Sequence, residues 1–148
     1  MKITLEYLEK KSACSDGIEF VTKNGLIGLE DKDFIKKLIE LKKLNYANWL
    51  IVRVLSNVNT IKYAIFAAEQ VIDIFEKECP DDDRPRRAIE AAKAYISNPC
   101  KETKKNAAAA YASANAAYAA ADAAADAAAA DAANAAMLKI IKYGINLL

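Results

Sequence analysis

A run of thirty residues without glycine or proline, most of them alanine, constrains the fold of this chain more than any other segment. Of the thirty positions of residues 107–136, AAAAYASANAAYAAADAAADAAAADAANAA, twenty-two are Ala. Alanine has the highest helix propensity, so the run is expected to be helical before any tertiary contact is counted. The sequence therefore predicts a long Ala-rich helix near the C-terminus, with little chemistry on its surface.

The faces of this helix predict close packing. At about 100° per residue, Tyr111, Tyr118 and Asp122 fall on one stripe, and two other faces are almost entirely Ala. Methyl-only faces let another helix approach closely, so we expect packing against neighbours or a homodimer through the Ala faces. A continuous helix over 103–143 would be about 60 Å long, longer than a domain of about 40 Å. The helix is therefore expected to break, to extend beyond the domain or to meet a partner, and a break is most favoured near 134–137.

The remainder of the chain also predicts helices. Only residues 49–55, WLIVRVL, are rich enough in β-branched residues to suggest a strand, and we assign them to a buried helix because their neighbours are helical. Capping and breaking residues, with Thr4 and the pair Ser15-Asp16 as N-cap candidates, then delimit the expected helices. These cover residues 4–8, 15–24, 34–44, 49–55, 60–77 and 85–96, with an interruption at 45–48.

These helices predict an all-α fold. We expect a single-domain multi-helix bundle over residues 1–148 that ends in the long Ala-rich C-terminal helix. Within it lie N-terminal helices (1–30), central helices (31–99) and the Ala-rich helix (101–148).

Composition restricts the class of protein. Lys and Arg number 21 against 20 Asp and Glu, a balance that argues against non-specific nucleic-acid binding and against an acidic decoy of nucleic acid. Three cysteines, odd in number and without Cys-x-x-Cys spacing, indicate reduced thiols in a cytoplasmic protein. No apolar run has the length of a signal peptide core or a bilayer span, so we expect no membrane association.

Catalytic sets are missing from the sequence. The chain has no histidine, which removes the commonest general base and metal ligand, and it has no Gly-rich phosphate loop or nucleophile elbow. The acidic triplet Asp81 to Asp83 precedes Arg-Pro and is expected to start a helix, not to hold a metal. We therefore expect no enzyme, no cofactor and no metal site.

The segment 79–95, CPDDDRPRRAIEAAKAY, holds the strongest candidate for a partner-binding site. Arg84, Arg86 and Arg87 fall in the first turn of an expected helix, where the macrodipole disfavours positive charge. On a structural interpretation, bidentate pairs with acidic residues compensate the arginines and dock two helices. On a functional interpretation, the arginines bind an anion or a protein. The expected structural ion pairs involve Glu69, Asp73, Asp83 and Glu90.

The structural interpretation has a consequence for stability. If Arg86 and Arg87 are structural, replacing both with Met should leave buried acidic residues of the preceding helix without partners, at a cost of about 3–5 kcal/mol each. If the protein still folds but loses a binding partner, the two arginines are functional.

A second candidate is the single tryptophan. Trp49 stands four residues before Arg53, and such a pair is either core or an interface anchor. The complete set of expected partner-binding residues is Arg84, Arg86, Arg87, Trp49, Arg53, Tyr111 and Tyr118.

Residues 61–99, IKYAIFAAEQVIDIFEKECPDDDRPRRAIEAAKAYISNP, resemble the central block of an immunity-protein family of bacterial polymorphic-toxin systems. In that family a helix ending Ala-Glu-Gln-Val, an acidic-Arg-Pro-Arg turn and a helix with Ala-Ile-Glu-Ala-Ala precede a long Ala-rich helix. The resemblance implies a small helical inhibitor that acts by stoichiometric binding to a protein. The matching residues are Ala68, Glu69, Gln70, Val71, Phe75, Pro80, Asp82, Asp83, Arg84, Pro85, Arg86, Ala88, Ile89, Glu90, Ala91 and Ala92.

The N-terminal stretch ITLEYLEKKSACSDGIEFV is similar to short proteins encoded by bacteriophages and prophages. This similarity widens the expected targets from a cognate toxin to a host defence nuclease or complex, as for an anti-CRISPR-type inhibitor.

Three hypotheses about function follow. The first is a non-catalytic inhibitory binding protein, an immunity or anti-defence protein with a protein partner. The second is a self-assembling structural or accessory phage protein that pairs through its Ala faces. The third is a nucleic-acid-binding regulator, which the even charge balance disfavours and which would use a basic stripe of Lys36, Lys37, Lys42 and Lys43.

Overall fold

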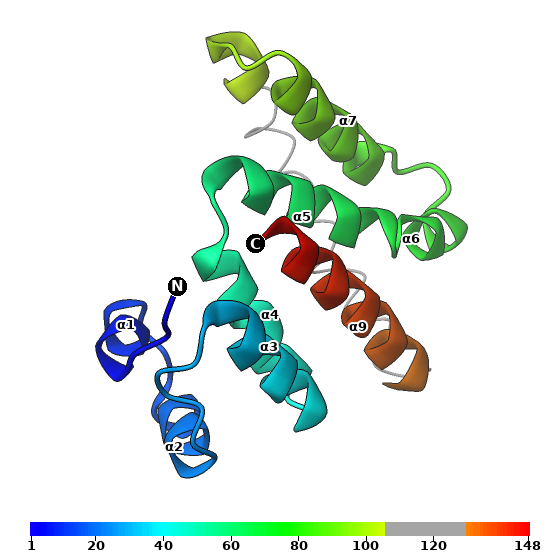
Figure 1. Ribbon diagram of the computed structural model, residues 1–148. Helices are drawn as coiled ribbons and strands as arrows, with labels where there is room; N and C mark the ends of the chain where they lie inside the picture. Colours follow the sequence, from blue (N-terminus) through cyan, green and yellow to red (C-terminus); the bar gives the residue numbers. More distant parts are fainter. Residues whose placement is uncertain (106–129) are drawn as a thin grey trace. The chain divides into compact units, whose positions relative to one another are not determined.

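The computed structural model describes residues 1–105 and 130–148, and over these residues it is built from α-helices without a sheet (Figure 1). The predicted all-α class is confirmed. The chain forms two units. The terminal unit consists of Met1–Ser56 and Met137–Leu148, and the central unit of Asn57–Ala136.

The terminal unit joins both ends of the described chain. It contains α1 (Leu5–Lys10), α2 (Ser15–Lys23), α3 (Asp31–Glu40), α4 (Leu44–Val54) and the C-terminal part of α9 (Ala130–Leu147). Helices α3 and α4 pack against each other. The apolar run 49–55 lies in α4 and its C-cap, so its assignment to a helix is confirmed.

The core of the terminal unit is apolar and draws on distant parts of the sequence. Ile141 of α9 is fully buried although more than eighty residues separate it from Ser56. Burial of an aliphatic side chain stabilises a fold by about 1.5–3 kcal/mol, so the C-terminal helix is part of this core. The buried side chains are Ile3, Leu8, Val21, Leu26, Phe34, Ile35, Leu38, Ala47, Leu50, Ile51, Leu55, Ile140 and Ile141.

Three helices of this unit end in the same hydrogen-bonded turn. After α1, α2 and α3, a residue adopts positive φ: Ser12 (59°), Gly25 (66°) and Lys42 (57°). In each turn the next N–H donates to a carbonyl five residues earlier, as Lys43 does to Leu38 at 2.8 Å, which is the Schellman arrangement. Only glycine adopts this conformation without steric cost, so Ser12 and Lys42 each store about 1 kcal/mol of backbone strain.

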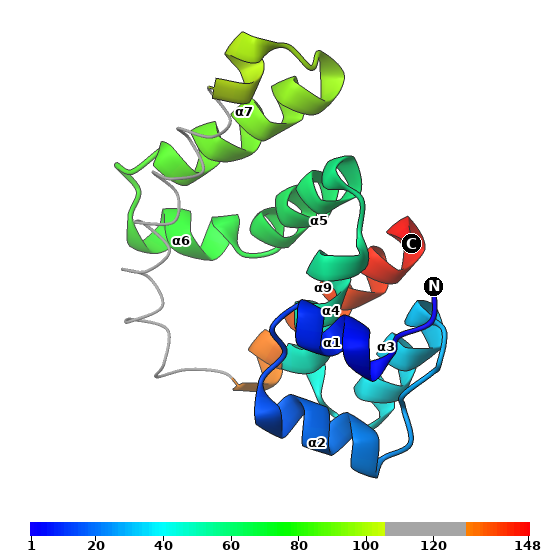
Figure 2. The same ribbon diagram turned by 90° about the vertical axis from the view of Figure 1, so that its left-hand side faces the viewer.

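The central unit is a helical hairpin. It contains α5 (Asn57–Glu69), α6 (Ile72–Glu78) and α7 (Arg84–Ser97), and residues 101–105 and 130–136 are also helical. Helix α7 runs back along α5 after the turn that follows α6 (Figure 2). Pro85 occupies the first turn of α7, where its missing N–H leaves no hydrogen bond unmade. The buried side chains of this hairpin are Tyr63, Ile72, Phe75, Pro85 and Ile89.

Local signals predicted several helix ends correctly. Thr4 is the N-cap of α1, and its Oγ1 accepts a hydrogen bond from the Tyr7 N–H at 3.1 Å. Helix α6 ends just before Cys79-Pro80, and α7 ends before Asn98-Pro99. The prediction for α2 was wrong, because Cys14 and not Ser15 is its N-cap and its side chain makes no capping hydrogen bond.

Predictions of helix breaks were wrong in three places. The expected interruption at 45–48 does not occur, because Ala47 is fully buried within α4. The expected break near 134–137 does not occur either, since α9 continues through it without a Gly or Pro. Conversely, the helix expected over 60–77 is divided between α5 and α6 at Gln70 and Val71.

The division between α5 and α6 is a local distortion of the backbone next to buried side chains. The Gln70 N–H is shared between the carbonyls of Phe66 and Ala67, and the backbone of Val71 leaves the helical region with φ −125° and ψ −9°. After the break, Ile72 and Phe75 are both buried. The break contains no Gly or Pro, and it coincides with the start of the buried positions of α6.

Candidate functional site

The predicted arginines lie at the turn between α6 and α7, where each has an acidic partner. Both carboxylate oxygens of Asp82 accept hydrogen bonds from Arg84. Its Oδ1 accepts from the Arg84 Nε at 2.8 Å and from the Arg84 backbone N–H at 3.1 Å, while its Oδ2 accepts from Arg84 Nη2 at 2.6 Å. These bonds lower the pKa of Asp82 to about 2. Asp82 therefore stays ionised and fixes the entry into α7.

Arg86 connects the two helices of the turn. Its guanidinium binds the carboxylate of Glu76 in a bidentate pair, with Nη2 at 2.7 Å from Oε2, and it lies 3.9 Å from Asp73. Hydrogen bonds from Arg86 lower the pKa of Glu76. This pair links α6 to α7 across the turn.

The remaining acidic residues differ in their partners. Asp83 pairs with Arg87 at 3.1 Å, one turn along the chain. Glu69 and Glu90, which we expected beside the arginines, both pair with Lys93, at 3.0 and 2.9 Å. The sequence reasoning missed Lys93, although the spacing of three residues between Glu90 and Lys93 is a signal for such a pair.

The charged side chains of α6 and α7 are exposed. The acidic residues of α6 are therefore not buried, contrary to the premise of the predicted effect of replacing Arg86 and Arg87. The side chain of Asp73 is 83% exposed, and those of Arg86 and Glu76 are 51% and 34% exposed. Charges in water interact weakly, so these pairs position side chains more than they stabilise the unit. Among them Ile74 is 59% exposed, an aliphatic residue surrounded by charge.

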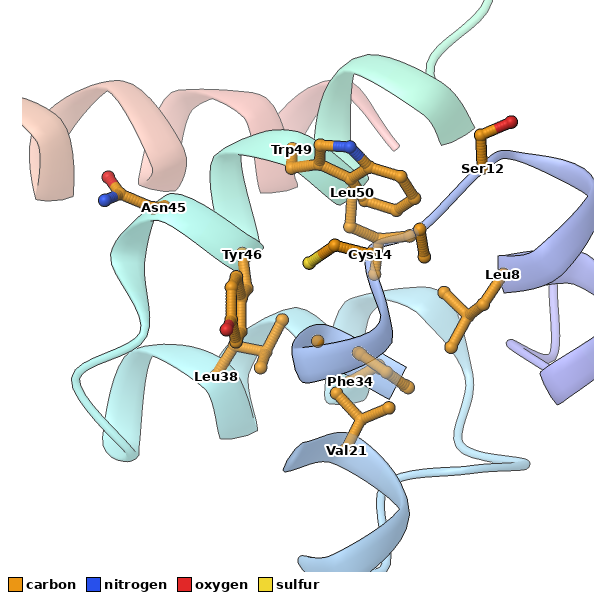
Figure 3. A pocket seen from close by; sticks show the side chains of 12 residues that line it. Leu8, Ser12, Cys14, Val21, Phe34, Leu38, Asn45, Tyr46, Trp49 and Leu50 are labelled. Atoms are coloured by element: carbon orange, nitrogen blue, oxygen red, sulfur yellow. The ribbon is translucent and has the colours of Figure 1, made fainter. Parts of the chain in front are cut away.

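A cavity of about 330 Å³ lies in the terminal unit (Figure 3). It is bounded by α1, α2, α3 and α4 and the turn between α1 and α2, and Trp49 forms part of its wall. Most lining groups are apolar, so the cavity favours apolar matter over water. The lining residues are Leu8, Ser12, Ala13, Cys14, Gly17, Val21, Phe34, Leu38, Asn45, Tyr46, Trp49 and Leu50.

Trp49 and Arg53 form a stacked pair on α4. The guanidinium carbon of Arg53 is 3.8 Å from the centre of the indole ring, a cation–π contact. Arg53 Nη1 also donates to the carbonyl of Trp49 at 3.1 Å, and the Tyr7 hydroxyl donates to the carbonyl of Arg53 at 3.0 Å. Three contacts therefore fix the wall residue and its neighbouring charge.

A second cation lies over an aromatic residue of the cavity. Lys43 Nζ is 5.6 Å from the ring centre of Tyr46 and 4.9 Å from that of Phe20, and these two rings meet edge to face. Tyr46 lines the cavity. Two aromatic residues that line the cavity, Trp49 and Tyr46, therefore each have a cationic side chain against the ring.

The expected partner-binding residues that the structure describes are divided between the two units. Arg84, Arg86 and Arg87 belong to the central unit, whereas Trp49 and Arg53 belong to the terminal unit. Tyr111 and Tyr118 lie outside the described residues. The cavity itself was not predicted, because its lining comes from four helices whose arrangement no local pattern specifies.

All three cysteines are free and exposed. Cys14 lines the cavity, and Gly17 leaves room for its thiol, since a Cβ at residue 17 would stand 3.1 Å from Cys14 Sγ. Hydrogen bonds with Thr103 lower the pKa of the Cys100 thiol. The three thiols therefore differ in surroundings.

The described part of the chain shows neither a metal-binding cluster nor a membrane-spanning helix. Residues 1–105 and 130–148 contain no group of three or more His, Cys, Asp or Glu side chains that could hold a metal ion. Among their helices, none combines the length and the apolar character that a bilayer-spanning helix requires.

Comparisons with known proteins bear on residues 52–147. Over this span the chain matches a family model described as Imm-5 like putative immunity protein. No curated protein and no solved structure matches the chain. The matched span includes the charged turn between α6 and α7, whereas every residue that lines the cavity precedes it.

Proposed function

The chain belongs to the Imm-5-like immunity protein family, and on that premise we propose that it is a non-catalytic inhibitor that neutralises a protein toxin by stoichiometric binding. The family match over residues 52–147 carries this proposal. It covers about two thirds of the chain and agrees with the resemblance inferred from residues 61–99.

We place the toxin-binding surface on α6, the following turn and the start of α7. This surface lies within the matched span and combines exposed Ile74 with the charges of Asp73, Arg86 and Arg87. An apolar anchor inside a polar rim is the usual organisation of a protein interface.

The charge of this surface favours a basic partner. Residues 69–90 contain eight acidic and four basic residues. Because each arginine is already paired and acidic residues outnumber basic ones, acidic groups such as Asp81 remain for the partner. A nuclease toxin presents a basic surface to nucleic acid, and acidic residues that cover it would block the substrate and accelerate association.

We propose a cytoplasmic location for the protein. The supporting observation is that Cys14, Cys79 and Cys100 are all exposed and free. Exposed thiols persist in a reducing compartment. A toxin that acts inside the cell would be met there.

Co-expression tests the proposed function. Toxin domains from the genome that encodes this chain are expressed in a laboratory bacterium with and without it, and survival is scored. We expect rescue from one toxin and a 1:1 complex in size-exclusion chromatography with light scattering. The proposal is contradicted if the chain rescues the bacterium from none of the toxins, or if it rescues without forming a complex.

Two variants test the surface. Replacing Ile74 with Lys should weaken toxin binding at least tenfold, which corresponds to about 1.4 kcal/mol. Leu5→Lys is the matched control, since Leu5 is also an exposed aliphatic residue but lies in α1 of the terminal unit. Equal affinities for the two variants would exclude α6 from the interface.

The same experiments separate the other candidate roles. Complex formation with a defence nuclease, without rescue from a toxin, would identify an anti-defence protein. Light scattering of the chain alone tests the homodimer expected from the Ala faces, most of which lie outside the described residues.

A further inference from the structure

The cavity of the terminal unit is not used by the proposed function. Its lining residues lie between Leu8 and Leu50, before the span 52–147 that matches the immunity family. The toxin-binding surface proposed above lies in the central unit. The cavity therefore needs an explanation of its own, and that explanation does not rest on the proposed function.

We propose that this cavity binds a small anionic amphiphile. The aromatic or branched hydrocarbon body of the ligand occupies the cavity, and its acidic head group lies beside Lys43 or Arg53.

The size and lining of the cavity match such a body. Its volume of about 330 Å³ falls in the range of small-molecule sites, roughly 300–1,000 Å³. Phe34, Tyr46 and Trp49 supply aromatic surface, and Leu8 and Leu38 supply aliphatic surface. Few of its lining residues are polar, and Ser12 and Asn45 are among them.

Charge selects the head group. Lys43 lies over the ring of Tyr46, and Arg53 is stacked on Trp49, so a cation adjoins each of these two lining rings. Neither cation pairs with a carboxylate in the described part of the chain, whereas Lys36 and Lys37 of α3 both do. Two uncompensated cations beside an apolar cavity favour a ligand that is apolar at one end and anionic at the other.

Binding in the cavity can be followed by the intrinsic fluorescence of the protein. Trp49 is the only tryptophan and lines the cavity, so all indole fluorescence comes from it. The anionic probe 1-anilinonaphthalene-8-sulfonate should bind the whole protein with 1:1 stoichiometry and quench Trp49 by energy transfer. The neutral N-phenyl-1-naphthylamine should bind about three- to fivefold more weakly, as expected for the loss of one exposed charge contact.

Two pairs of variants localise the probe. Cys14→Phe places an aromatic ring where the probe would bind and should abolish saturable binding. Cys14→Ser, in which the side chain keeps nearly the same size, should retain it. The double variant Lys43→Gln/Arg53→Gln should remove the preference for the anionic probe, and Lys36→Gln should leave it unchanged. Circular dichroism establishes that each variant is folded.

Alkylation of Cys14 provides a measurement that does not require a cavity-filling variant. With Cys79 and Cys100 replaced by Ser, iodoacetamide modifies only Cys14. Saturating anionic probe should slow this modification at least fivefold.

Three results would overturn the proposal. These are the absence of saturable binding, binding that survives in Cys14→Phe, and an unchanged alkylation rate in the presence of the probe. Equal affinity for the two probes would overturn the assignment of an anionic head group.

Discussion

Arg86 of α7 holds Glu76 of α6 in a bidentate pair across the turn that joins the two helices, with Nη2 at 2.7 Å from Oε2. The pair is exposed at the surface. Its geometry is that of a strong interaction, but its energy is limited by water and salt. It therefore fixes the relative orientation of two helices without being a main source of their stability.

Charge reversal tests this limited role. Arg86→Glu and Glu76→Arg should each lower the Tm by no more than about 2 °C, and the double reversal should restore it. Differential scanning calorimetry at low and high salt measures the effect, which should diminish with salt. A decrease above about 10 °C in either single variant would indicate a pair that is effectively buried.

Acid should destabilise the turn through Asp82. Its pKa is lowered from 3.8 to about 2 by its hydrogen bonds with Arg84. A pKa that is lower in the folded state gives stability that is present above pH 4 and is lost as the pH falls toward 2. Urea unfolding between pH 5 and 2 should show this loss in the parent protein and a shallower dependence in Asp82→Asn. Identical slopes would contradict the assignment.

Alkali should act through Tyr63 of α5. Burial raises the pKa of its hydroxyl to about 12. A raised folded-state pKa means that the contribution to stability is complete below pH 10 and is lost as the pH rises from 10 toward 12. Absorbance at 295 nm should show a delayed tyrosine titration that Tyr63→Phe removes. Its persistence in that variant would assign it to another tyrosine.

The C-terminal helix should be essential for the terminal unit. Ile141→Ala removes a fully buried side chain and should cost about 2–5 kcal/mol. Urea unfolding followed by Trp49 fluorescence reports on this unit. Ile74→Ala, at an exposed position of the other unit, is the control and should change the free energy of unfolding by less than about 0.5 kcal/mol. Equal effects would contradict the location of Ile141 in the core.

Relief of backbone strain should stabilise the turn after α3. Lys42→Gly removes the steric cost of φ 57° and should increase the free energy of unfolding by about 0.5–1 kcal/mol. Lys36→Gly, in the middle of the same helix, should decrease it by about 1 kcal/mol. Chemical denaturation distinguishes the two signs.

The candidate sites were predictable to different degrees. Arg84, Arg86 and Arg87 stand together in the sequence, so their proximity to Asp82 and Asp83 followed from spacing alone. Lys93, in contrast, binds Glu69 from a different helix. The cavity was invisible in the sequence, because Leu8, Phe34 and Trp49 are ordinary apolar residues until the helices that carry them are packed.

The sequence by itself determined the helical class, several helix ends and the family. Propensity, caps such as Thr4 and breakers such as Pro80 act within a few residues, and their effects can be read locally. Tertiary structure alone decided that Ile141 completes the core of the terminal unit and that a cavity opens beside Trp49. These features depend on burial between segments far apart in the chain, which outweighs local preference and has no local signature.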